Sequence, residues 1–108
     1  MTSEVLRVRL YDDGNRRVRL VLEGELDLAT APMFAAKLTQ ACTDKPAELR
    51  IDLTHLTYCD SSGLREFVRA AEVCASNDTQ LRIVGARRWV HQAFVITNLA
   101  DDFSFEAE

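Results

Sequence analysis

The segment whose residue types could carry chemistry is Cys59-Asp60-Ser61-Ser62-Gly63-Leu64, where two hydroxyls follow a carboxylate. An alternating apolar run precedes it and an amphipathic run of helical period follows, so a strand would deliver both serines to the start of a helix. A helix N-terminus carries unpaired backbone N–H groups and a partial positive charge, and Gly63 has no side chain to crowd a bound group. We therefore predict that this turn can accept a phosphate without unfolding the domain.

A purely structural explanation of the same turn stays open. Asp60, Ser61 and Ser62 are all favourable N-cap residues, and capping a helix requires only one such side chain. A short string of this kind therefore needs support from other parts of the chain before it indicates regulation.

Enzymatic and metal chemistry find little support in the sequence. His55 and His91 are the only histidines, neither is marked as a base for Ser61, and no phosphate-binding GxxxxGK[ST] run occurs. The three cysteines follow no metal-ligand or disulfide spacing. We predict a protein that is not an enzyme and holds no metal or cofactor. A thiol redox sensor is the alternative from a different class, with Cys59 as its sensor because it lies two residues from Ser61.

Composition restricts the protein class further. The chain has 108 residues, 47% of them hydrophobic, which suits one domain spanning 1–108 with a core of its own. Its net charge of −4 disfavours non-specific nucleic-acid binding. No run approaches the about 20 apolar residues that span a bilayer, and no signal-peptide core is present. We expect a freestanding cytoplasmic protein with no membrane partner.

Periodicity predicts alternating strands and helices. Strands are expected around residues 6–10, 18–22, 49–53, 81–83 and 103–105, and helices after Thr30, after Gly63 and from Trp89 to Ile96. Tyr11 to Asn15 is expected to form a hairpin turn. The helix after Gly63 should bury Leu64, Phe67, Val68, Ala71 and Cys74 or Ala75. This order predicts an α/β fold with a central mixed sheet of four to five strands and helices packed against it.

A second segment, Gly24-Glu25-Leu26-Asp27-Leu28-Ala29-Thr30-Ala31, follows the second predicted strand. Together with the Asp60-Ser61-Ser62-Gly63 turn, it resembles the STAS family of sulfate-transporter and anti-sigma-factor-antagonist domains. The resemblance covers nearly the whole chain and includes the segments IDLTHLTYCDSSGL and LRIVGARRWVHQAFVITNLADDFSF.

The resemblance implies a function. Standalone bacterial members bind an anti-sigma factor, usually a serine kinase, and so free a sigma factor. The kinase phosphorylates the first serine of the motif, which is Ser61 here, and a phosphatase reverses the reaction. The implied partner surface comprises Glu25, Asp27, Asp60, Ser61, Ser62, Gly63, Leu64 and Arg65, although Arg65 stands where the family often has a small residue. A scaffold or signalling component of a stress-sensing assembly, with the same fold, is the alternative.

Overall fold

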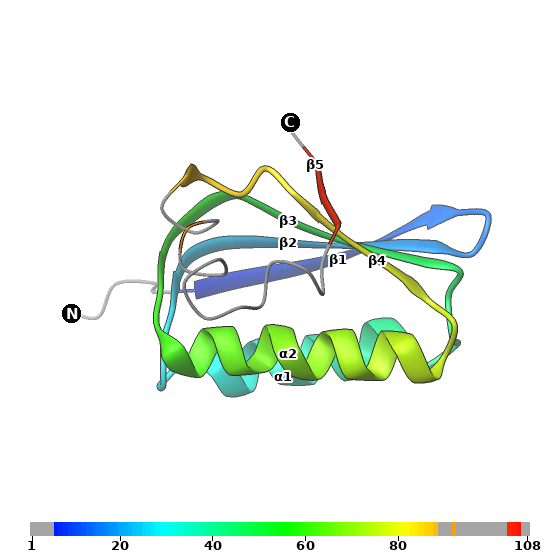
Figure 1. Cartoon of the computed structure of the whole chain (residues 1–108), viewed down its shortest axis with the longest axis horizontal. Helices are drawn as coiled ribbons and strands as arrows, with labels where there is room; N and C mark the ends of the chain where they lie inside the picture. Colours follow the sequence, from blue (N-terminus) through cyan, green and yellow to red (C-terminus); the bar gives the residue numbers. More distant parts are fainter. Residues whose placement is uncertain (1–5, 89–91, 93–103, 107–108) are drawn as a thin grey trace.

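The computed structural model describes residues 6–88, 92 and 104–106, which form one sheet with helices packed on it (Figure 1). The described strands and helices, in chain order, are β1 (Leu6–Gly14), β2 (Arg17–Leu26), α1 (Ala31–Cys42), β3 (Glu48–Cys59), α2 (Ser61–Ser76), β4 (Gln80–Val84) and β5 (Ser104–Glu106). Of the third helix predicted from Trp89 to Ile96, the described residues include only Gln92, which is helical.

The sheet is mixed and its strands follow the order of the chain, β1-β2-β3-β4-β5. β1 and β2 pair antiparallel, whereas β2, β3, β4 and β5 run parallel to one another. Helices α1 and α2 connect parallel neighbours, and both cover the same face of the sheet (Figure 1). The predicted fold class is confirmed. Because parallel strands end at one edge, the segments that follow β2 and β3 leave the sheet together.

The hairpin turn lies further along the chain than the sequence predicted. β1 continues through Tyr11 as far as Gly14, and the turn is made by Asn15 and Arg16 with φ values of 55° and 60°. A two-residue hairpin turn of this kind requires positive φ at both positions, which suits the right-handed twist of the strands. Tyr11 therefore still pairs with Arg19, whose guanidinium lies 4.4 Å from the centre of the tyrosine ring.

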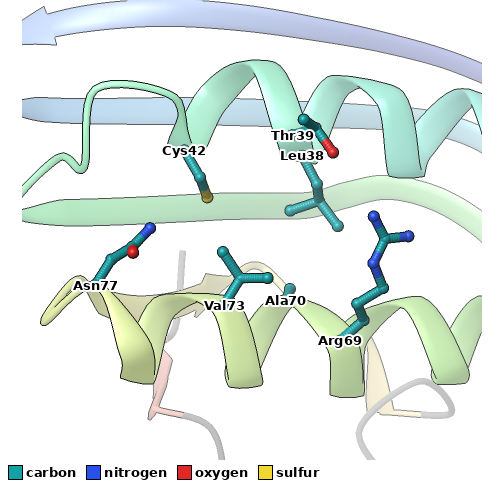
Figure 2. A pocket seen from close by; sticks show the side chains of 7 residues that line it. All are labelled: Leu38, Thr39, Cys42, Arg69, Ala70, Val73 and Asn77. Carbon is teal, nitrogen blue, oxygen red and sulfur yellow. The ribbon is translucent and has the colours of Figure 1, made fainter.

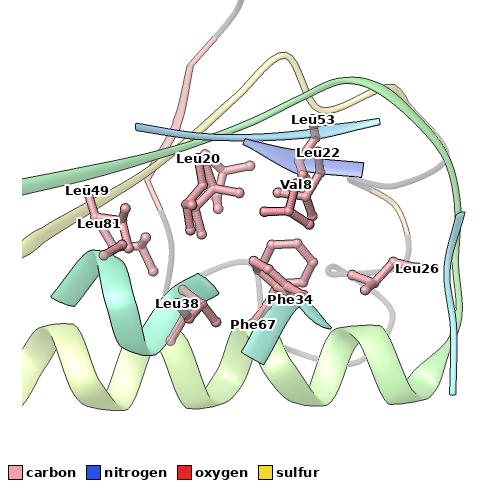
Figure 3. Close-up of a cluster of buried hydrophobic side chains, with 14 of the residues drawn as sticks. Val8, Leu20, Leu22, Leu26, Phe34, Leu38, Leu49, Leu53, Phe67 and Leu81 are labelled. Atoms are coloured by element: carbon pink, nitrogen blue, oxygen red, sulfur yellow. The ribbon is translucent and has the colours of Figure 1, made fainter. Parts of the chain in front are cut away.

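The core lies between the sheet and the two helices (Figure 3). Alternate residues of the strands point towards the helices, where they meet Phe34 of α1 and Phe67 of α2, whose ring centroids are 5.1 Å apart. On α2 the buried stripe includes Ala70, while Val68 and Ala71, which we predicted to be buried, are only half-buried. The stripe is rotated because α2 packs against α1 as well as the sheet.

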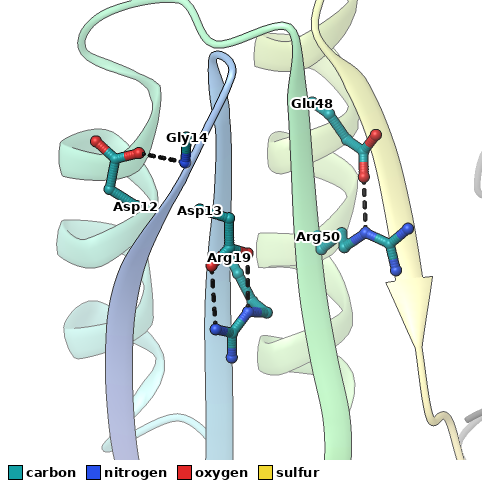
Figure 4. Close-up of polar contacts among 6 residues, drawn as sticks. All are labelled: Asp12, Asp13, Gly14, Arg19, Glu48 and Arg50. Carbon is teal, nitrogen blue, oxygen red and sulfur yellow. Dashed lines mark hydrogen bonds and ion pairs between the residues drawn. The ribbon is translucent and has the colours of Figure 1, made fainter.

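The opposite face of the sheet is charged. Arg19, Arg50 and Arg82 lie in register on β2, β3 and β4. Arg19 binds both carboxylate oxygens of Asp13 at 3.0 and 3.1 Å (Figure 4). Glu48 pairs with Arg50 at 2.7 Å and lies 3.7 Å from Arg82. Burial of apolar side chains by the described helices is therefore confined to one face.

Candidate functional site

The segment after β2 and the turn after β3 lie side by side at one end of the sheet. Leu26 pairs with Cys59, the last residue of β3, and the next residue, Asp60, donates its backbone N–H to the Leu26 carbonyl at 3.2 Å. The Thr57 hydroxyl donates to the Gly24 carbonyl at 2.9 Å. The two motifs that the sequence singled out are therefore held together by backbone contacts.

A β-bulge shapes the first of these segments. The pairing register of β2 shifts between Gly24 and Glu25, and Gly24 has a φ of 108°, which a residue with a side chain rarely adopts. A bulge bends its strand and redirects the side chains beyond it. Glu25 is consequently exposed, while the next residue, Leu26, is fully buried under the turn that precedes α2.

Asp60 is the N-cap of α2. Its backbone is extended, and its Oδ1 accepts hydrogen bonds from the N–H groups of Ser62 at 2.9 Å and Gly63 at 3.2 Å. Our prediction that these helix-terminal donors are free for a phosphate is therefore wrong, because the Asp60 carboxylate occupies them. Ser61, the first residue of the helix, is exposed, and among the described residues its hydroxyl forms no hydrogen bond.

The absence of a side chain at Gly63 allows close packing of the core and does not open the helix N-terminus to an anion. It is buried, and a Cβ at this position would lie 2.7 Å from Cγ of Leu26 and 2.8 Å from Sγ of Cys59. The predicted role of leaving room for a bound group is a mistaken one, since the missing side chain leaves room for the protein's own core. Leu64 is only 8% exposed and also belongs to that core. Both residues shape the turn from beneath.

The Asp27 side chain forms hydrogen bonds within its own segment, between β2 and α1. Its Oδ1 accepts from the N–H groups of Ala29 at 3.0 Å and Thr30 at 3.1 Å. Thr30 stands at the N-cap position of α1, as predicted, but its hydroxyl points back and donates to the Glu25 carbonyl at 2.9 Å. The Asp27 carboxylate thus fixes the conformation in which the neighbouring residues are presented to solvent.

Exposed apolar side chains flank the two motifs. Leu28 is 74% exposed, and Met33 and Tyr58 are close to half exposed. Leu28 lines an open pocket of about 320 Å³ between the first turns of α1 and α2, together with Ser62 and Arg65. Sequence reasoning did not include Leu28 in the site, although it is an apolar residue outside both the strand and the helix periodicities.

Comparison with known proteins places this arrangement in a family. Residues 10–105 match the family described as "Mlab, STAS domain". The chain belongs to the STAS domain family, among the anti-sigma factor antagonists. It is 35% identical over 78 residues to the anti-sigma-B factor antagonist of Staphylococcus aureus, a match that covers 72% of each chain.

Solved structures share the fold of this STAS domain. An anti-sigma factor antagonist from Mycobacterium paratuberculosis superposes with a TM-score of 0.82 at 21% identity, covering 93% of this chain and 84% of that one. The Bacillus cell fate determinant SpoIIAA in its phosphorylated form gives a TM-score of 0.74 at 17% identity, covering 94% and 93%. At these identities the likeness establishes the fold alone.

His55 and Cys59 both lie on β3, close before the turn that begins α2. His55 is exposed on β3 opposite Glu23, and no hydrogen bond among the described residues joins it to Ser61; His91 lies outside them. Burial, and then the charge of Asp60, raise the pKa of the Cys59 thiol to about 12. Cys59 is therefore protonated at neutral pH and a weak nucleophile.

Two further findings concern the described residues only. They contain no group of three His, Cys, Asp or Glu side chains placed to hold a metal ion. Neither α1 nor α2 is long and apolar enough to cross a membrane.

Proposed function

We propose that this STAS domain binds an anti-sigma factor serine kinase when Ser61 is unmodified, and that phosphorylation of Ser61 ends the binding. The observation that carries the proposal is the placement of Ser61. Its hydroxyl is exposed at the first residue of α2, beside the pocket lined by Leu28, while Asp60 and Gly63 are committed to holding the turn.

Docking of the unmodified form rests on the surface around Ser61. Leu28 offers a large exposed apolar side chain, and Ser62 and Arg65 are among the residues that line the adjoining pocket. A partner that covers Leu28 would gain the free energy of removing it from water, roughly 1.5–3 kcal/mol for a side chain of this type. Glu25 and Arg65, both exposed, would contribute charged contacts at the rim.

Phosphorylation would change the charge of this surface. A phosphoserine carries about −1.5 to −2 charges at neutral pH, and here it would stand next to Asp60 and near Glu25 and Asp27. Because Asp60 already occupies the backbone donors of Ser62 and Gly63, those donors are not available to neutralise the phosphate. The phosphate would face the partner, and its desolvation and repulsion would lower affinity by roughly 5–150-fold.

The test is a phosphotransfer assay with ATP and a panel of candidate anti-sigma factor kinases, beginning with those that recognise anti-sigma-B factor antagonists. Wild type is compared with Ser61→Ala and with Ser62→Ala, a matched control one residue further into the same helix. We expect label on wild type and on Ser62→Ala but not on Ser61→Ala, with removal of that label by a phosphatase.

Binding is measured in parallel by calorimetry with unmodified and phosphorylated protein. Label that persists in Ser61→Ala would contradict the assignment of Ser61. Binding to a kinase without label on any variant would instead favour a scaffold within a larger assembly. Fractionation of cells would test the cytoplasmic location that belongs to this proposal.

A further inference from the structure

A second feature whose side chains could carry chemistry is the pair Cys42 and Cys74. Cys42 is the last residue of α1 and Cys74 lies in the last two turns of α2, so the pair joins the two helices at the end opposite to Ser61. They are 7% and 2% exposed, and both belong to the buried core cluster. Cys42 follows Phe34 of α1 by eight residues and Cys74 follows Phe67 of α2 by seven, and the two rings are 5.1 Å apart, so the parallel helices bring the two cysteines to the same level of their interface. The two cysteines are separated by 32 positions of sequence, which is why their spacing gave no signal.

A pocket gives one of the two sulfurs access to solvent. It lies between α1 and α2, has a volume of about 230 Å³, and is lined by Leu38, Cys42, Ala70 and Val73, with Arg69 and Asn77 at its two ends (Figure 2). A water molecule occupies about 30 Å³ in the liquid, so a small oxidant such as hydrogen peroxide fits inside. Cys42 points into this pocket, whereas Cys74 is not among its lining residues.

From this geometry we infer that Cys42 and Cys74 form a peroxide-sensitive thiol pair that oxidises to a disulfide between α1 and α2. The Cys42 thiolate attacks one oxygen of hydrogen peroxide, which breaks the O–O bond, gives a sulfenic acid on Cys42 and, after protonation, releases water. The Cys74 sulfur then attacks the Cys42 sulfur, and the departing hydroxyl takes up the Cys74 proton and leaves as a second water. The two thiols lose two electrons, and the peroxide gains them.

The order of attack follows from the environments of the three cysteines. Cys42 lines the pocket and Cys74 does not. Interaction with the Cys74 thiol also lowers the pKa of Cys42, whereas that interaction, with burial, raises the pKa of Cys74. Cys42 therefore combines solvent access with thiolate character, which are the two properties that select a cysteine for oxidation. Cys59 lacks thiolate character at neutral pH because its pKa is raised. We therefore assign the redox role that the sequence suggested for Cys59 to Cys42 and Cys74.

Trypsin separates the three cysteines, which allows a direct test on the wild-type protein. Cleavage after Lys37, Arg50, Arg65, Arg69 and Arg82 places Cys42, Cys59 and Cys74 in peptides 38–50, 51–65 and 70–82. The folded protein is treated with hydrogen peroxide, alkylated in urea and digested. We expect peptide 38–50 to be joined to peptide 70–82, with peptide 51–65 alkylated and the link reversed by a thiol reductant. Peptides 38–50 and 70–82 that both remain alkylated, or a link to 51–65, would overturn the inference.

The order of the steps is tested with single variants and a sulfenic-acid trap, dimedone. Cys74→Ala removes the resolving thiol, so peroxide should leave a dimedone adduct on Cys42. Cys42→Ala should give no adduct on Cys74, and Cys59→Ala should form the disulfide as wild type does. If Cys42→Ala formed an adduct on Cys74 in the same yield as Cys74→Ala forms one on Cys42, the assignment of Cys42 as the attacking sulfur would be refuted. The outcome is independent of whether Ser61 is phosphorylated, so this inference and the proposed function fail separately.

Discussion

Replacing Gly63 with alanine tests whether the turn before α2 is fixed by packing. The added Cβ would stand 2.7 Å from Cγ of Leu26 and 2.8 Å from Sγ of Cys59, both nearer than carbon and sulfur atoms approach without displacement. Leu26 is fully buried, and its Cγ is not the free end of a flexible chain, so the backbone or the core must shift. Overpacking of this kind costs about 1–3 kcal/mol. Alanine in a helix recovers up to about 1 kcal/mol relative to glycine.

We therefore expect Gly63→Ala to lower the free energy of unfolding by about 1–2 kcal/mol, which for a domain of this size lowers Tm by roughly 4–16 °C. Urea unfolding of wild type, Gly63→Ala, Cys59→Ala and the double variant measures the coupling free energy between positions 59 and 63. Because Cys59→Ala removes one of the three close atoms, the double variant should lose less stability than the sum of the single variants. A Gly63→Ala protein as stable as wild type, or additivity in the double variant, would refute the packing argument.

Three other perturbations have expected outcomes. Asp60→Ala should lower the free energy of unfolding by about 1 kcal/mol through loss of the α2 cap, as measured by urea titration. Asp60→Asn should retain most of the stability that the cap contributes, because asparagine is also a favourable N-cap residue. Leu28→Ser should change that free energy by less than about 0.5 kcal/mol, since the side chain is 74% exposed, but weaken binding of the kinase in calorimetry. The hydrogen bond from Arg19 holds the pKa of Asp13 below its ordinary value of 3.8. The stability that the Asp13–Arg19 pair contributes is therefore present above pH 4 and lost as pH falls through the lowered pKa of Asp13. Between neutral and acidic pH, the free energy of unfolding of Arg19→Gln should therefore fall less than that of wild type.

The fold was predictable because burial on one face of a sheet enforces alternation. Leu49, Ile51 and Leu53 alternate with charged residues, and all three are fully buried against the helices. The hairpin was misplaced because Asp13-Gly14 is a strong turn signal in isolation. Pairing of Tyr11 with Arg19 extends the strands past it, and that contact depends on register rather than on local sequence.

The proximity of the two motifs was predictable, but the role of each residue was not. The motifs around Asp27 and Ser61 do lie together, because parallel strands end at one edge. The same string did not reveal that Asp60 uses its carboxylate on its own helix, or that Gly63 faces Leu26. Both facts depend on which side of α2 is buried, and a four-residue turn carries too little periodicity to define it. The proximity of Cys42 and Cys74 depends in the same way on the packing of α1 against α2.

The structure also predicts how the switch that we propose at Ser61 would act. A negative charge in the first turn of a helix gains about 0.3–1 kcal/mol from the helix dipole, and repulsion from the adjacent Asp60 carboxylate opposes that gain. Ser61→Asp should therefore leave the free energy of unfolding within about 0.5 kcal/mol of wild type, as for other exposed positions. Affinity for the kinase should nevertheless fall by roughly 5–150-fold. Urea unfolding and calorimetry on the same samples separate the two effects. A loss of affinity accompanied by a large loss of stability would indicate a conformational switch that remodels the turn, while unchanged affinity would remove the electrostatic mechanism altogether.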